Sequence, residues 1–106
     1  MNKAVEIENI EEMRRQVGID DVELRQAIRG LRAGDFVHLT FVSASTPAVR
    51  ETVRVRVTSV AGREFRGRLA QRPASPGLAV LRVGARVVFR ADHIHSVAKG
   101  RPTPAR

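Results

Sequence analysis

The chain has 106 residues, 42% of them hydrophobic, which is enough for one domain with a modest core. It contains no cysteine, which excludes a disulfide framework, a thiolate zinc site and a cysteine nucleophile, and fits a reducing compartment. The N-terminus lacks the apolar run of a signal peptide, and no stretch approaches the ~18 apolar residues of a membrane span, so we expect a cytoplasmic protein.

The net charge of +8 is unevenly distributed along the chain. Residues 1–35 carry eight acids and six bases, a net charge of −2, whereas residues 36–106 carry three acids and thirteen bases, a net charge of +10. The two parts can partly neutralise each other on folding. Seventeen of the nineteen basic residues are arginine, which suits bidentate binding of phosphate or carboxylate, although a GC-rich codon bias gives the same ratio.

A first helix is predicted over residues 6–17. Ile7, Ile10 and Val17 follow the spacing of one buried stripe, and Gly18 is a suitable stop. Acidic side chains lie near the start of this segment and basic ones near its end, in the order that the helix dipole favours: Glu6, Glu8, Glu11, Glu12, Arg14 and Arg15.

A second helix is predicted to begin at Asp20 and to end at Gly34. Asp20 and Glu23 have the spacing of a capping box. Joined by Val-Gly-Ile-Asp, the two helices would form a compact helical hairpin over residues 5–33. Three arginines of the second helix share one face, at Arg25, Arg29 and Arg32.

From Asp35 the hydrophobic period changes to two, which predicts strands. We expect core side chains from Val37, Leu39 and Phe41 in the first strand, and from Val87 and Phe89 in the fourth. A loop at 43–49 contains Pro47, a second loop covers 72–82, and a tight turn near Asp92 precedes a short last strand at 96–97. The predicted strands cover residues 36–42, 50–60, 63–71 and 85–90.

These elements predict an α+β fold in a single domain, residues 1–97. The strands are too short and too closely spaced for parallel crossovers. We therefore expect the helical hairpin (5–33) to be followed, over 35–97, by a four- to five-stranded antiparallel sheet, strongly bent or closed into a small open barrel of the SH3-like kind. The tail, 98–106, is predicted to be disordered.

The second and third strands carry alternating arginines, which should lie on one exposed face of a β-hairpin. A three-residue turn at Val60-Ala61-Gly62 would set Arg56 opposite Arg66 and Arg54 opposite Arg68. Like charges directly across a strand pair repel, so this face needs water, salt, an acidic segment of the chain or an acidic partner. The four arginines, Arg54, Arg56, Arg66 and Arg68, are the leading candidate binding residues.

Residues 34–97 resemble an uncharacterised bacterial family, the YegJ-like proteins. The matching segments are Gly34-Asp35-Phe36-Val37-His38-Leu39-Thr40-Phe41, Gly62-Arg63-Glu64-Phe65-Arg66-Gly67-Arg68-Leu69, and Gly84-Ala85-Arg86-Val87-Val88-Phe89 with His93-Ile94. Ala85 stands where the family commonly has an acid. The resemblance implies a fold but no known activity, and it supplies no catalytic residue.

No catalytic motif or metal-ligand spacing is present in the sequence. His38, His93 and His95 are three possible ligands, but no Glu-x-x-His or similar spacing links them. Ser43, Ser45 and Thr46 lie in a loop near His38 without a Gly-x-Ser-x-Gly elbow. We therefore predict no enzyme activity, no metal and no cofactor.

Two functions fit a basic sheet face. The first is a protein-interaction module that binds an acidic protein, or the carboxylates of the first helix within a homodimer. The second is nucleic-acid binding, with Phe36 as the one aromatic side chain that the core does not require. A helix-turn-helix variant would instead use Arg25, Gln26, Arg29 and Arg32, against which the acidic first helix argues. We favour the first function and expect no membrane contact.

Overall fold

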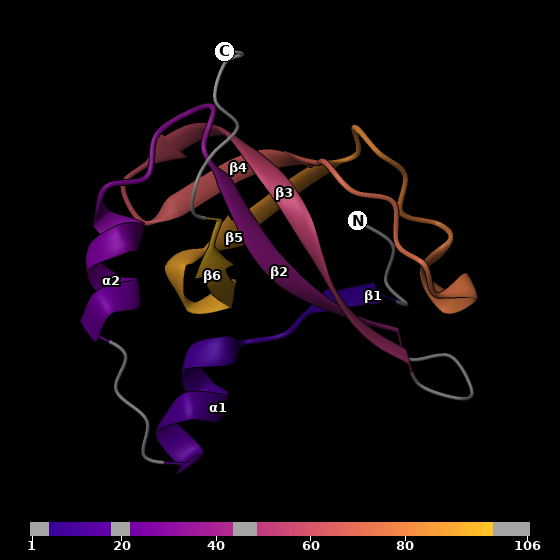
Figure 1. Ribbon diagram of the computed structural model, residues 1–106, viewed down its shortest axis with the longest axis horizontal. Helices are drawn as coiled ribbons and strands as arrows, with labels where there is room; N and C mark the ends of the chain where they lie inside the picture. Colours follow the sequence, from indigo (N-terminus) through magenta and orange to yellow (C-terminus); the bar gives the residue numbers. More distant parts are fainter. Residues whose placement is uncertain (1–4, 18–21, 44–48, 99–106) are drawn as a thin grey trace.

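The computed structural model describes residues 5–17, 22–43 and 49–98. The protein is α+β, with a bent antiparallel sheet that is nearly closed into a barrel, and few helices (Figure 1). The strands are β1 (Val5–Ile7), β2 (Phe36–Ser43), β3 (Val49–Ala61), β4 (Glu64–Leu69), β5 (Arg86–Arg90) and β6 (Ile94–Val97). The helices are α1 (Ile10–Val17) and α2 (Val22–Arg29), with the 3-10 turns η1 (Pro76–Leu78) and η2 (Ala91–His93).

Strand β2 is the hub of the sheet. On one edge it pairs with β3 along its whole length, from Phe36 opposite Arg56 to Ser43 opposite Val49. Its other edge is divided between β1, which pairs with the C-terminal half, and β6, which pairs with the N-terminal half. Because β3, β4 and β5 follow in order, the return of β6 to β2 brings the two ends of the sheet together.

The core confirms the predicted period of two. Val37, Leu39 and Phe41 of β2 are completely buried. Phe65 and Phe89 lie opposite each other on β4 and β5, and their rings stack with centroids 5.5 Å apart. The predicted loop at 72–82 also contributes to the core, because η1 and the residues after it bury Leu78 and Leu81.

The prediction of a helix from residue 6 is wrong. Val5, Glu6 and Ile7 form strand β1, and the helix begins at Ile10. The Asn9 side chain accepts a hydrogen bond from the backbone N–H of Glu12 (2.8 Å), which is the contact of an N-terminal cap.

The second helix is shorter than predicted, since it ends at Arg29 rather than near Gly34. The predicted stop Gly18 and cap Asp20 lie outside the described residues, as does the rest of the connection between α1 and α2. Both helices contact the barrel: α1 touches η2 and α2 touches β6.

The ends of the predicted loops and tail also differ. Ser43 and Val49 pair with each other at the ends of β2 and β3, and the residues between them, Pro47 included, lie outside the described part of the chain. Ala98, which the sequence assigned to a disordered tail, donates its backbone N–H to the Phe36 carbonyl (3.0 Å) and so is attached to the sheet.

No helix in the described part of the chain is both long enough and apolar enough to cross a membrane.

Candidate binding face

The outer surface of the sheet presents arginines while the inner surface is apolar. Val53, Val55 and Val57 of β3 are completely buried. The arginines that alternate with them on β3, and those on β4 and β5, are exposed. We call this surface the arginine face, consisting of Arg54, Arg56, Arg66, Arg68 and Arg86.

The hairpin register differs from the predicted one. Ala61 pairs with Glu64, so Gly62 and Arg63 form the turn, with Gly62 in the left-handed conformation (φ 66°). Nearer the middle of the hairpin the register shifts between Val57 and Ser59, which is a β-bulge. The three-residue turn and both predicted arginine pairs are therefore wrong.

The observed register creates a continuous row of arginines across three strands. Arg56 of β3 lies opposite Arg68 of β4, and Arg68 lies opposite Arg86 of β5. On the other side of β3, Arg56 lies opposite Phe36. Adjacent strands are about 4.8 Å apart, so three cations and one aromatic ring occupy a short line perpendicular to the strands.

The remaining two arginines flank this row. Arg54 lies opposite His38, and its guanidinium carbon is 5.4 Å from the centroid of the Phe36 ring, a cation–π distance. Arg66 lies between Ser59 on β3 and Val88 on β5. Within the row itself, Arg68 donates a hydrogen bond to the Gly84 carbonyl (3.0 Å), which fixes its side chain along the sheet.

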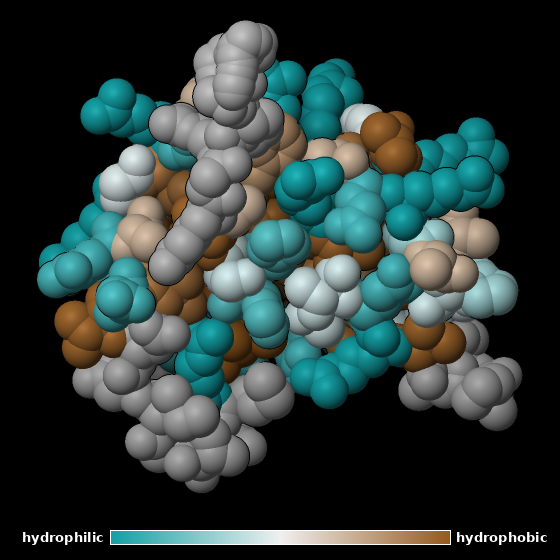
Figure 2. Space-filling model, viewed as in Figure 1, coloured by the Kyte–Doolittle hydropathy of each residue, from teal (hydrophilic) through white to brown (hydrophobic). Residues whose placement is uncertain are grey.

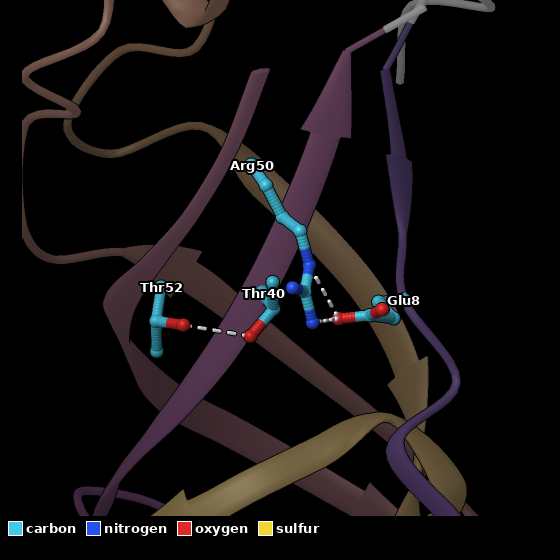
Figure 3. A network of polar contacts seen from close by, with 4 residues as sticks. All are labelled: Glu8, Thr40, Arg50 and Thr52. Atoms are coloured by element: carbon cyan, nitrogen blue, oxygen red, sulfur yellow. Dashed lines mark hydrogen bonds and ion pairs between the residues drawn. The ribbon is translucent and has the colours of Figure 1, made fainter. Parts of the chain in front are cut away.

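The acidic N-terminal segment neutralises a different arginine. Glu8 accepts hydrogen bonds from Arg50, with a shortest N–O distance of 2.7 Å. Figure 3 shows the Arg50 side chain crossing β2 to reach Glu8, beside a hydrogen bond (2.7 Å) between the Thr40 and Thr52 hydroxyls. Among residues 5–17, 22–43 and 49–98, no ion pair joins a carboxylate to the arginine face.

The three arginines of the alternative site on the second helix do not all lie on that helix. Arg25 and Arg29 are exposed on α2 and line a groove at one end of the barrel. Arg32 follows the end of α2, and its backbone N–H is bound by the Asp35 carboxylate (2.9 Å). The three arginines therefore do not form one helical face.

Two of the three histidines come together at the seam between β2 and β6. His38 Nδ1 and His95 Nδ1 each lie 3.1 Å from the Ser96 hydroxyl. Burial lowers the pKa of His38, and the nearby charges of His95 and Arg54 lower it further. The partner of His38 is thus Ser96 rather than Ser43, which lies at the opposite end of β2.

His93 lies apart from that pair, in η2. Its Nδ1 accepts the backbone N–H of Arg90 (3.0 Å), and burial together with the charge of Arg90 lowers its pKa. In the described part of the chain, no group of three His, Asp or Glu side chains is arranged to hold a metal ion.

The sequence reasoning missed Arg86 and Glu51. Arg86 continues the alternation of Val87 and Phe89, so the signal was present in the sequence. The Glu51 carboxylate accepts the backbone N–H groups of Ala74 (2.8 Å) and Ser75 (2.9 Å), and these hydrogen bonds lower its pKa. No pattern in the sequence indicated that this acid holds the 70–85 loop against β3.

Comparison with known proteins gives no match: no family model, no curated protein and no solved structure is significantly similar to the chain.

Proposed function

We propose that the protein is a small, non-enzymatic binding module whose arginine face binds an acidic protein surface. The observation that carries the proposal is the row of Arg56, Arg68 and Arg86 in direct cross-strand register. Like charges placed directly opposite each other destabilise a sheet. An acidic partner would remove that repulsion, and electrostatic complementarity would give the contact its specificity.

Nucleic acid is the alternative ligand, and Phe36 is the observation that favours it. This ring ends the arginine row, and small barrels bind single strands by combining basic grooves with stacked aromatic rings. Phe36 is half-buried, however, and Arg54 lies over it. We therefore rank an acidic protein first.

The experiment compares two probes of similar charge, a fluorescein-labelled hexadecaglutamate and a labelled single-stranded DNA, at ~50 and ~200 mM salt. Replacement of Arg56 and Arg68 by Glu should weaken binding of the preferred probe by about tenfold or more. The matched control replaces the exposed loop residues Arg72 and Arg82 by Glu, which changes the net charge equally.

The outcomes separate the two ligands. Tighter binding of the DNA, with a steep salt slope, would favour the nucleic-acid alternative. Equal losses in the face variant and the control variant would show that net charge, and not the arginine face, governs binding, and would overturn both.

Three further expectations belong to this proposal. We propose that the module works in the cytoplasm, for which the absence of cysteine is the support. We propose that α1 and α2 pack as a helical hairpin beside the barrel. We also propose a relation of residues 34–97 to the YegJ-like proteins, which adds no activity.

A further inference from the structure

A groove of about 880 Å³ lies at one end of the barrel. Its walls come from α1, α2, the turn between β3 and β4, and η2. None of the residues of the arginine face lines it. The groove is therefore a separate candidate site, and its role does not depend on the function proposed for the arginine face.

The rim of the groove is predominantly basic. Among the described residues that line it, four are arginines, two from α2, one from the β3–β4 turn and one from the end of β5, whereas two carboxylates, Glu11 and Asp92, oppose them. The four cations outnumber the two anions, so the rim favours an anionic ligand. The arginines are Arg25, Arg29, Arg63 and Arg90.

The interior of the groove is apolar. Ile28 of α2 is half-buried, Val60 at the end of β3 is 42% exposed, and Leu31 and Phe65 lie beneath them as part of the core. An apolar floor under a basic rim suits a ligand that carries both a negative charge and an apolar group.

Helix α2 is incompletely covered. None of its eight residues is buried, although Leu24 and Ile28 are partly buried against the core. Figure 2 shows hydrophobic surface exposed between α2 and the sheet, at the left of that view. A helix of a folded domain normally buries one apolar stripe, so the apolar side of α2 lacks part of its cover.

We propose that this groove binds an acidic peptide segment that places an apolar side chain between α2 and the β3–β4 turn. The arginines would pair with the carboxylates of the peptide, and Ile28 and Val60 would cover its apolar side chain. A nucleic acid fits less well, because Phe65, the aromatic residue of the groove, is 4% exposed and offers no face for base stacking.

The test uses two fluorescein-labelled twelve-residue peptides of equal charge, one alternating Glu and Leu and the other alternating Glu and Ser. We expect the Glu-Leu peptide to bind more tightly, by about tenfold or more, because it alone fills the apolar floor. Chemical-shift changes in ¹⁵N-labelled protein should concentrate in α2, the β3–β4 turn and η2.

Variants localise the binding. The pair Arg29→Gln and Arg63→Gln should weaken binding of both peptides, whereas Ile28→Ser should lower the preference for Glu-Leu over Glu-Ser. The matched control, Arg72→Gln with Arg82→Gln, removes two exposed loop arginines that belong to neither site and should leave the Glu-Leu affinity nearly unchanged. Circular dichroism and thermal unfolding of each variant check that the fold is retained.

Two results would overturn the proposal: equal affinity of the two peptides for the natural protein, or an equal loss of Glu-Leu affinity in the groove and control pairs. Single-stranded DNA of equal charge that displaces the Glu-Leu peptide and shifts the same amides would assign the groove to nucleic acid instead. If the arginine face does not bind an acidic ligand, the proposal for the groove still stands, because the two sites share no residue.

Discussion

Gly67 shows how a single residue permits close packing between two strands. It lies on the inner side of β4, opposite Val57. A Cβ added to it would meet the Arg56 carbonyl oxygen at 2.5 Å and the Val55 Cγ1 at 2.8 Å, both closer than real Cβ contacts. The absence of a side chain therefore allows β4 to pack closely against β3, where the bulge near Thr58 increases the local twist.

We expect Gly67→Ala to lower the free energy of unfolding by about 1–3 kcal/mol, because the backbone of β3 must move to admit the methyl group. Urea denaturation followed by circular dichroism would measure the change. Gly30→Ala is the matched control, since its added Cβ meets its nearest neighbour at an ordinary 3.7 Å. A Gly67→Ala variant as stable as the Gly30→Ala variant would refute the argument.

At the scale of elements, the segment that contains β1 and α1 fits both a helical and a strand periodicity. Ile7, Ile10 and Val17 fit a helix, but Val5 and Ile7 also fit a strand. The strand forms because the edge of β2 next to Phe41 and Ser43 is available for pairing, and a single sequence does not reveal that edge. The Asn9 cap marks the true start and could have been recognised from its residue type.

We expect Asn9→Ala to reduce the free energy of unfolding by about 1 kcal/mol, because the N–H of Glu12 loses its acceptor. Asn9→Asp, which keeps the acceptor and favours the helix dipole, should stay close to the natural protein. Chemical denaturation of the three proteins measures both effects. A loss in Asn9→Asp as large as that in Asn9→Ala would show that the cap contributes little.

The strands were more predictable than their register. Alternation identified the buried residues of β2, β3, β4 and β5 because each strand has one apolar side. The register of β3 and β4 depends on a bulge and a two-residue turn, and neither has a signal as strong as alternation. The four candidate arginines thus face outward as expected. Their cross-strand neighbours, and the place of Arg86 in the arginine row, could be determined only from the structure.

At the scale of the whole molecule, no carboxylate of residues 5–17, 22–43 or 49–98 forms an ion pair with the arginine face. Glu8 reaches Arg50 at one end of β3, and Glu11 lies at the groove beyond the other end. The positive charge of the arginine face is therefore not neutralised by an ion pair within the described part of the chain. It keeps the molecule attractive to acidic partners, and such attraction weakens with salt.

The stability of the fold should depend on pH. His38 lies on the seam between β2 and β6, and its pKa and that of His93 are lowered from the ordinary value of 6.5. Because the unfolded chain takes up protons first as the pH falls below about 7, the free energy of unfolding should decrease toward the lowered pKa values and should be level above about 7.

Unfolding measured between pH ~5.5 and ~7.5 checks this expectation. His38→Gln keeps a polar partner for Ser96 and should reduce the slope, and the double variant with His93→Gln should reduce it further. A stability that rises as the pH falls from ~7 to ~5.5, or a slope that both substitutions leave unchanged, would contradict the assignment.

The position of β2 between the two ends of the chain also determines how the fold can assemble. The chain from β2 to β5 is a meander of neighbouring strands, but Ser96 must meet His38, 58 residues earlier. Closing so long a loop costs more entropy than forming a hairpin, and non-local pairings slow folding. We expect the meander to form early and β6 to dock last, which makes barrel closure the rate-limiting event of folding.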